Sequence, residues 1–425
     1  MRVTHIPQLF NMNLFKTSAL SAVSVLVRIL VMLGLNKVLA IYVGPGGYAL
    51  IGQFQNFIQM VLSVSGGAVN TGITKYTSQY YDNKPKRVSF WRAGMTITLL
   101  ASGITAVAVA LMSDYLAIYL LHDVSFSGVF IWLSITLVLF ALNNFLLAVL
   151  NGRKEVVRYV LCSVAGNIFS LIITFVLVVK FGIYGAFVAL ATYQSVTLFI
   201  TIFFCCKSQW LSYDNFIGSA DIGSFKALGL YAVMALTSAI CVPLSHIFIR
   251  SFLGANFGLV SAGMWEALWR LSATYLMVIT ATLAVYYLPR LSELKSNEEI
   301  KNEIIKILKI VLPLVMAMGV LLYLLRGLVI TILFSKSFLP MEELMGWQLF
   351  GDTFKVASWI LGFVLTAKAL WKQYVVTEIL FSLSFCLLVV FFQPLGLKGA
   401  VVAHAVNYSL HLLAMFLILR KERIL

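Results

Sequence analysis

Long apolar runs constrain this chain more than any other feature. Twelve runs of about twenty or more residues follow one another along the sequence, and a run of that length can cross the hydrocarbon core of a bilayer as a helix. Only 11% of the residues are charged, whereas soluble domains carry about 25%. We therefore predict an all-α polytopic membrane protein with twelve transmembrane helices. The predicted spans are residues 14–43, 48–73, 92–112, 128–150, 156–179, 184–206, 226–249, 258–287, 307–333, 344–367, 374–392 and 397–419.

The net charge of +15 is explained by where the basic residues lie. Twelve spans place the loops alternately on two sides of the membrane. Of the 31 Lys and Arg residues, 22 fall on the side of both termini and four inside spans. Cytoplasmic loops carry the excess of basic residues, so we expect both termini in the cytoplasm and do not expect a nucleic-acid partner. The opposite side receives five basic residues, Lys180, Arg250, Arg326, Lys336 and Lys398.

A polar stretch at residues 207–226 separates the first six spans from the last six. We expect it to link two six-helix lobes, residues 1–212 and 213–425. An offset of 210 residues aligns Gly44 with Gly254 and gives several further identities, which agrees with parallel internal repeats. Lobes of this kind bind their substrate in a central cavity near the membrane midplane.

Charged residues lie deep within three of the predicted spans, where a single ionisable side chain costs at least ~2.5–3.5 kcal/mol. Each of two acidic residues shares a helix face with a nearby base, at i,i+4 or i,i+3, and can be partly neutralised by it. Four cations against two anions leave a positive interior, which predicts an anionic ligand. Structural ion pairs between the lobes are the alternative. The six residues are Arg28, Lys37, Glu266, Arg270, Asp352 and Lys355.

Amides and indoles accompany these charges. Gln53, Asn56 and Gln59 lie on the second span, and Trp265 and Trp269 on the eighth. Amides can hydrogen-bond to sugar hydroxyls, and aromatic faces can pack against sugar rings, so these residues are candidates for a glycan path. Interhelical hydrogen bonds between amides are an equally good interpretation.

The sequence indicates no catalytic, metal or nucleotide site. It has no G-x-x-x-x-G-K-[ST] motif, and its five cysteines lie in apolar segments without C-x-x-C spacing. We therefore expect no cofactor, and transport that is passive or coupled to a proton or sodium gradient. Asp352 and Glu266 are the candidates for ion coupling.

Four segments carry a resemblance to a known family: VGPGGYAL (43–50), GITKYTSQYYDN (72–83), YYLPRLSEL (286–294) and WQLFGDTFKV (347–356). With Arg28 and Lys37 in the first span, they make the chain resemble the Wzx-type O-antigen and polysaccharide flippases, in particular the lipid III-like ones, of the multidrug/oligosaccharidyl-lipid/polysaccharide exporter (MOP) superfamily.

The resemblance implies a MATE-like, V-shaped fold. It also implies translocation of undecaprenyl-pyrophosphate-linked oligosaccharide from the cytoplasmic to the periplasmic leaflet of the bacterial inner membrane. A polysaccharide polymerase and a chain-length regulator of the same pathway are candidate partners. A net positive midplane suits the pyrophosphate, for which the candidate residues are Arg28, Lys37, Arg270 and Lys355.

Two other functions compete with a flippase. A multidrug or cation antiporter of the same fold would need acidic residues facing its substrate, and the predicted interior has the opposite charge. A polymerase or ligase of a glycan pathway would need a substantial outer loop, and the longest predicted outer loop, residues 113–127, is short. We predict a transporter that is not an enzyme.

Overall fold

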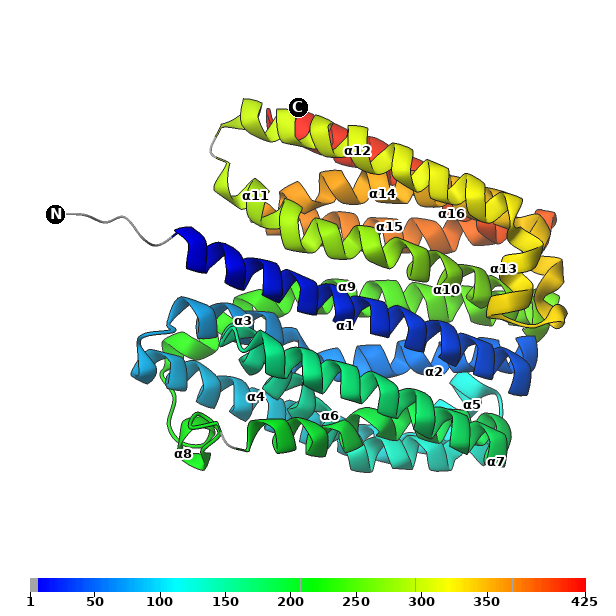
Figure 1. The fold of residues 1–425 in the computed structure, drawn as a ribbon. Coiled ribbons are helices and arrows are strands. Elements are labelled where there is room, and N and C mark those ends of the chain that lie inside the picture. Colours follow the sequence, from blue (N-terminus) through cyan, green and yellow to red (C-terminus); the bar gives the residue numbers. More distant parts are fainter. Residues whose placement is uncertain (1–6, 207, 295, 369) are drawn as a thin grey trace. The chain divides into compact units, whose positions relative to one another are not determined.

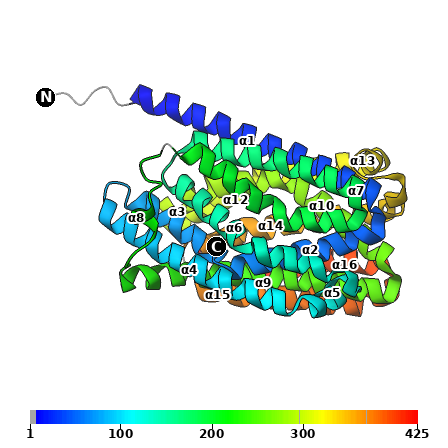
Figure 2. The same ribbon diagram turned by 90° about the horizontal axis from the view of Figure 1, so that it is seen from below.

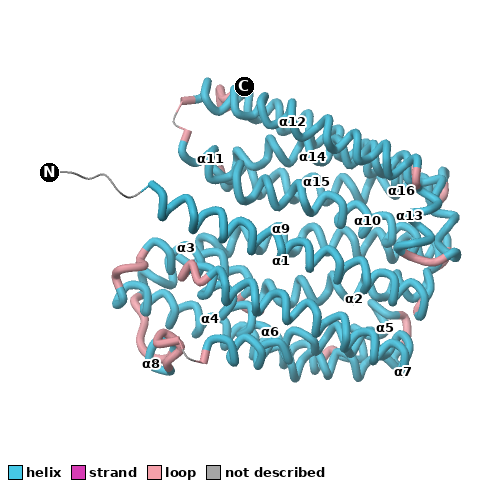
Figure 3. The backbone as a smooth tube through the Cα atoms, viewed as in Figure 1, coloured by secondary structure: helices cyan, strands magenta, loops and turns pink. Residues whose placement is uncertain are grey.

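The computed structural model describes residues 7–206, 208–294, 296–368 and 370–425, with side chains described from residue 23 onward except at 230, 231, 234, 284, 285 and 292. Residues 1–6, to which the prediction of a cytoplasmic N-terminus extends, lie outside this description. Within these ranges the chain forms helices, short helical turns and loops, and no strand (Figure 3). The structure thus confirms the all-α class.

Sixteen α-helices follow one another along the described chain (Figures 1 and 2). They are α1 (Pro7–Tyr42), α2 (Gly44–Val64), α3 (Asn70–Gln79), α4 (Lys84–Leu111), α5 (Ser113–Leu121), α6 (Ser127–Gly152), α7 (Val156–Cys205), α8 (Tyr213–Phe216), α9 (Ile222–Phe257), α10 (Leu259–Thr282), α11 (Leu288–Glu293), α12 (Asn297–Leu324), α13 (Arg326–Leu333), α14 (Met345–Ala367), α15 (Trp371–Phe391) and α16 (Leu397–Lys421).

Most predicted spans lie on one long helix each, but the span 48–73 runs from α2 into α3 and the span 307–333 from α12 into α13. Nine stretches of the described residues are long and apolar enough to cross a membrane. One of them, α7, holds two predicted spans, which are separated where Gly182 adopts φ 57° and ψ −134°. Glycine takes this left-handed conformation without steric cost. The helices α2 and α10, which carry the amides and charges noted above, are not among the nine.

The helices pack into two compact units. The first contains the chain up to Leu35 together with Ile58–Leu236, and the second contains Asn36–Phe57 and Thr237–Leu425. In the first unit α6 packs against α3, α4 and α7, and in the second α14 packs against α12 and α16. The last turns of α1 and most of α2 therefore belong with the C-terminal half of the chain. The lobe boundary at residue 212 stays a prediction.

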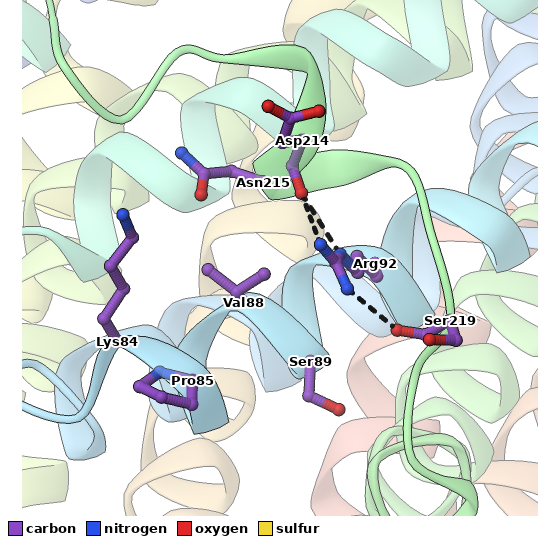
Figure 4. A pocket seen from close by; sticks show the side chains of 8 residues that line it. All are labelled: Lys84, Pro85, Val88, Ser89, Arg92, Asp214, Asn215 and Ser219. Carbon is purple, nitrogen blue, oxygen red and sulfur yellow. Dashed lines mark hydrogen bonds between the residues drawn. The ribbon is translucent and has the colours of Figure 1, made fainter.

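The polar linker after α7 is fixed to the first unit by aromatic packing and hydrogen bonds. The buried ring of Trp91 stacks on Phe216, with 5.4 Å between centroids. Arg92 donates to the carbonyl oxygen of Asp214 at 2.7 Å and to that of Ser219 at 3.2 Å (Figure 4). A cleft of about 510 Å³ lies beside these contacts, between the start of α4 and the linker. Its lining residues are Lys84, Pro85, Val88, Ser89, Arg92, Asp214, Asn215 and Ser219.

Glu155, just before α7, ties the same linker to the membrane helices. Its carboxylate accepts hydrogen bonds from Arg153 at 2.8 Å, Arg158 at 2.5 Å and the indole of Trp210 at 2.8 Å. Burial raises the pKa of this carboxyl, but the hydrogen bonds from the two arginines outweigh it and hold the pKa below the ordinary 4.5. A depressed folded-state pKa contributes stability that is present above the unfolded pKa and is lost as the pH falls through the folded value.

We therefore expect Glu155→Gln to lower the free energy of unfolding by about 1.5–3 kcal/mol near neutral pH, since hydrogen bonds to charged groups are worth about that much. The difference from the wild type should vanish in acid, where Glu155 is protonated. Thermal unfolding in detergent across a pH series measures it. The exposed Glu298→Gln is the control and should shift little at any pH. A Glu155→Gln difference that does not change with pH would contradict the assignment.

Candidate functional site

Two arginines enclose the carboxylate of Glu266 in the second unit. Glu266 on α10 is 5% exposed. It accepts hydrogen bonds from Arg270, one turn along the same helix at 2.7 Å, and from Arg250 on α9. The ion pair expected from the i,i+4 spacing is therefore present. The assignment of Arg250 to an outer loop was wrong, because α9 continues to Phe257 and buries Arg250 to 2% exposure.

The amides of α2 complete this cluster. Gln53 accepts from Arg250 Nε at 3.0 Å and donates to Ser251 at 2.8 Å, and Gln55 accepts from Arg270. Gly52 permits the close approach, because a Cβ there would lie 2.5 Å from Arg250. These are interhelical hydrogen bonds, the alternative that the sequence left open for the α2 amides.

Asn56 and Gln59, the other two amides on α2, do not take part in this cluster of hydrogen bonds between described residues. The Nδ2 atom of Asn56 is buried and has no hydrogen-bond partner among the described residues. Gln59 lies beyond the point where α2 passes into the first unit, and its side chain is exposed.

Lys37 and Arg28, both on α1, belong to different units. Lys37 donates to the carbonyl oxygens of Thr331 at 2.7 Å and Phe334 at 2.6 Å, at the end of α13. The last carbonyls of a helix lack partners within it, so the ammonium caps α13. Arg28 lies in the first unit with an exposed side chain and interacts electrostatically with Tyr193.

Lys355 on α14 is surrounded by aromatic rings. It is 5% exposed, and its ammonium lies 4.0 Å from the ring centroid of Trp269, 5.1 Å from that of Trp359 and 5.3 Å from that of Tyr408. Cation–π contacts of this kind stabilise a desolvated cation. In the described part of the chain, the ammonium of Lys355 makes no hydrogen bond and no ion pair, whereas its backbone carbonyl oxygen accepts from Ser358. Its N–H donors are thus available.

Asp352 and Lys355, which were expected to partly neutralise each other, form no salt bridge, although their charges interact electrostatically. The carboxylate of Asp352 has other hydrogen-bond partners. Its fully buried carboxylate accepts from Ser272 at 2.5 Å, Tyr275 at 2.9 Å and His404 Nε2 at 3.1 Å. Groups on α10 and α16 therefore surround the carboxylate, and an ionised Asp352 requires that His404 donate through Nε2. The i,i+3 spacing on α14 could not show these donors.

The two tryptophans of the predicted glycan path differ in exposure. Trp265 is fully buried, and its ring lies 5.5 Å from that of His246 and 5.8 Å from that of Trp269. Trp269 is partly exposed and borders Lys355. Only Trp269 keeps a ring face within reach of a ligand.

Comparison with known proteins places this arrangement in a family. Residues 54–343 match a family model described as "Polysaccharide biosynthesis protein". The chain is 30% identical over 404 residues, 94% of its length and 96% of each relative's, to the lipid III flippases of Escherichia coli (strain K12) and Shigella flexneri.

Solved structures share the fold at low identity. An inward-facing MATE family transporter of the MOP superfamily aligns with a TM-score of 0.74 and 14% identity, over 93% of this chain and 94% of the other. The lipid II flippase MurJ, in an inward closed conformation, aligns with a TM-score of 0.69 and 14% identity, over 96% of this chain and 87% of the other.

These similarities confirm the family resemblance and the MATE-like fold predicted from the sequence. They do not favour the antiporter alternative, because the relatives that align at 30% identity are flippases, whereas the MATE structures share only the fold. Since more than half of its length matches the family model and nearly all of it aligns with flippases, this chain belongs to the polysaccharide biosynthesis protein family as a multi-pass membrane transporter rather than an enzyme.

Proposed function

We propose that the protein flips undecaprenyl-pyrophosphate-linked oligosaccharide repeat units, of an O-antigen or a related surface polysaccharide, from the cytoplasmic to the periplasmic leaflet of the inner membrane. Relatives named lipid III flippases support a lipid-linked glycan as cargo. The observation that carries the proposal is Lys355, a buried cation whose hydrogen-bond donors are available beside the accessible ring of Trp269. A phosphate oxygen is a strong acceptor for such a donor.

Among the four candidate cations, we assign the pyrophosphate to Lys355 and keep Arg28 as a second candidate. Arg270 is paired with Glu266 and Gln55, and Lys37 caps α13, so we assign structural roles to these two. Trp269, whose side chain is partly exposed, and Asn56, whose amide nitrogen has no partner among the described residues, remain candidates for the glycan path. Gln59, three residues after Asn56, is exposed and is a further candidate. Both phosphates carry negative charge, and the lipid tail stays in the bilayer.

We further propose alternating access of two six-helix lobes as the mechanism, with both termini in the cytoplasm, no bound cofactor and an ion gradient as the source of energy. The flipped unit is a substrate for polymerisation outside the membrane. A polysaccharide polymerase and a chain-length regulator are therefore the proposed partners.

Deletion of the gene from its host tests the function. We expect a single-repeat, lipid-linked glycan to accumulate on the cytoplasmic side, and surface polymer to disappear until the wild-type gene is returned. Extraction of the polyprenyl-linked pool and analysis of its sugars would also identify the cargo. Unchanged polysaccharide together with altered sensitivity to cationic dyes would instead favour the antiporter.

A further inference from the structure

An acidic residue that the count of interior charges omitted lies on the inner face of α15. Glu378 is the eighth residue of this helix, about 10 Å from its first residue at 1.5 Å per residue. The exposed Leu387 lies nine residues on, half a turn around the helix, whereas the buried Phe385 lies seven residues on and shares the face of Glu378. Glu378 is therefore directed into the second unit and is partly buried there.

Among the described residues, the groups that interact with this carboxyl are neutral or weakly acidic. Ser238 on α9 hydrogen-bonds to it, and Cys241 on α9 and Tyr374 on α15 lie near it. Tyr408 on α16 is close enough to interact with it electrostatically. No ion pair of Glu378 occurs in the described residues. Also on α16, His411 faces α15 at Phe381, with 4.5 Å between ring centroids, and its Nδ1 lies 3.1 Å from the Ser358 hydroxyl.

The hydrogen bonds around Glu378 can carry either protonation state. The Ser238 hydroxyl lies 2.6 Å from that of Tyr374, and either atom can donate. When Glu378 is ionised, Ser238 donates its single proton to the carboxylate and accepts one from Tyr374. When Glu378 is protonated, it can donate to Ser238, which then donates to Tyr374, because hydroxyl protons rotate freely. The same three groups thus bind the acid and its conjugate base.

Glu378 is also connected to the proposed substrate site. Tyr408 interacts electrostatically with Glu378, and its ring centroid lies 5.3 Å from the ammonium of Lys355. Lys355 on α14 is twelve residues from the end of the helix at Ala367, about 18 Å. Glu378 therefore lies between Lys355 and the end of the unit that we assign to the cytoplasm.

The two acidic residues first considered for ion coupling are less suited to exchange a proton. Glu266 is held between two arginines, and Asp352 has four hydrogen-bond partners, Ser272, Tyr275, Gln348 and His404. Protonating either carboxylate would break these contacts. Protonation of Glu378 breaks none, and it removes an uncompensated charge from a membrane span.

We propose that Glu378 is the site that binds and releases the coupling proton, with Ser238 and Tyr374 as its positioning residues. This inference rests on the proposed transport function. Since flipping moves the substrate outward, a proton bound from the outer side and released towards the cytoplasm would drive it as antiport. The neutral and the charged form of Glu378 would then have different electrostatic effects on Lys355. Tyr408 connects the two residues, because it interacts with both.

Proteoliposomes containing the full chain in one orientation test the coupling. The probe is a polyprenyl-pyrophosphate-linked N-acetylglucosamine with a fluorophore on the sugar, whose leaflet is scored by quenching from outside. With one proton per cycle, an inward gradient of one pH unit shifts the steady-state leaflet ratio by up to about tenfold. We expect this shift in the wild type and in the control Glu298→Gln. Glu378→Gln should equilibrate the probe between leaflets without responding to the gradient.

A second measurement reads the protonated carboxyl without transport. Dicyclohexylcarbodiimide modifies protonated carboxyls in apolar surroundings, and peptide mass analysis should find it on Glu378, with labelling that declines as the pH rises. A Glu378→Gln variant that still follows the pH gradient, a wild type that follows sodium instead, or absent labelling would each overturn the inference. A wild type that moves no probe but labels at Glu378 would sink the proposed function and leave the proton site. If the Glu378→Gln variant does not fold, the Glu378→Asp variant takes its place in the transport measurement.

Discussion

Glu266→Gln is expected to destabilise the second unit by about 3–5 kcal/mol, because it leaves Arg250 and Arg270 buried without a counter-charge. The two guanidiniums are 2% and 8% exposed, so water cannot replace the lost carboxylate. Gln53 and Gln55 can accept one hydrogen bond each but offer no negative charge. Thermal unfolding of the detergent-solubilised protein measures the loss.

A matched pair near the surface provides the control. Arg326 and Glu342 form an ion pair at 3.1 Å, with both side chains 35% exposed, and exposed pairs of this kind contribute less than about 1 kcal/mol. Glu342→Gln should therefore unfold close to the wild type. The double variant Glu266→Gln with Arg250→Met should recover part of the loss, because it removes one of the two uncompensated charges. Equal stability of Glu266→Gln and Glu342→Gln would refute the buried cluster.

Length and hydropathy were enough to predict the membrane helices and fold class, because a bilayer permits little besides helices in a chain of this kind. They located helix ends less well. The seventh span was predicted to end at residue 249, where polar residues begin, but α9 continues to Phe257. Arg250 was therefore counted as a loop residue. Arg250 lies four residues after His246, and this spacing places both side chains on one helix face. The spacing was the sign in the sequence that the helix continues past residue 249.

Spacing along a helix predicted which side chains share a face, but not what opposes them. It correctly paired Glu266 with Arg270. For Asp352 it suggested Lys355, whereas donors from α10 and α16 occupy the carboxylate. Serine and tyrosine hydroxyls occur along most of the spans, so no sequence pattern distinguishes Ser272 or Tyr275 as partners. Contacts between helices distant in sequence require the three-dimensional packing.

The corrected charge inventory keeps the interior positive. Arg250 adds a cation and Glu378 adds an anion to the six residues first counted. Within the second unit, Arg250 and Arg270 are opposed by Glu266, and Lys37 by carbonyl oxygens. Asp352 is satisfied by neutral donors. Among the described residues, the ammonium of Lys355 has ring faces around it and no salt-bridge partner, although the charge of Asp352 interacts with it electrostatically. The anionic cargo is therefore assigned to Lys355.

Lys355→Met should consequently reduce transport of the pyrophosphate-linked probe by about 10- to 100-fold, since a hydrogen bond to a charged group is worth about 1.5–3 kcal/mol. Folding should change little, because a thioether also packs well against Trp269, Trp359 and Tyr408. Lys355→Arg keeps the charge and should retain part of the activity.

The exposed Lys398 provides the matched control on the same unit. Lys398→Met removes the same charge from a position without aromatic neighbours in the described structure, so it should transport at the wild-type rate. Unfolding temperatures of both variants exclude a general loss of structure. If Lys355→Met were folded and fully active, the pyrophosphate would have to be bound elsewhere. The aromatic surround of Lys355 would then be a packing device that stabilises a buried cation, and Arg28 would be the remaining candidate.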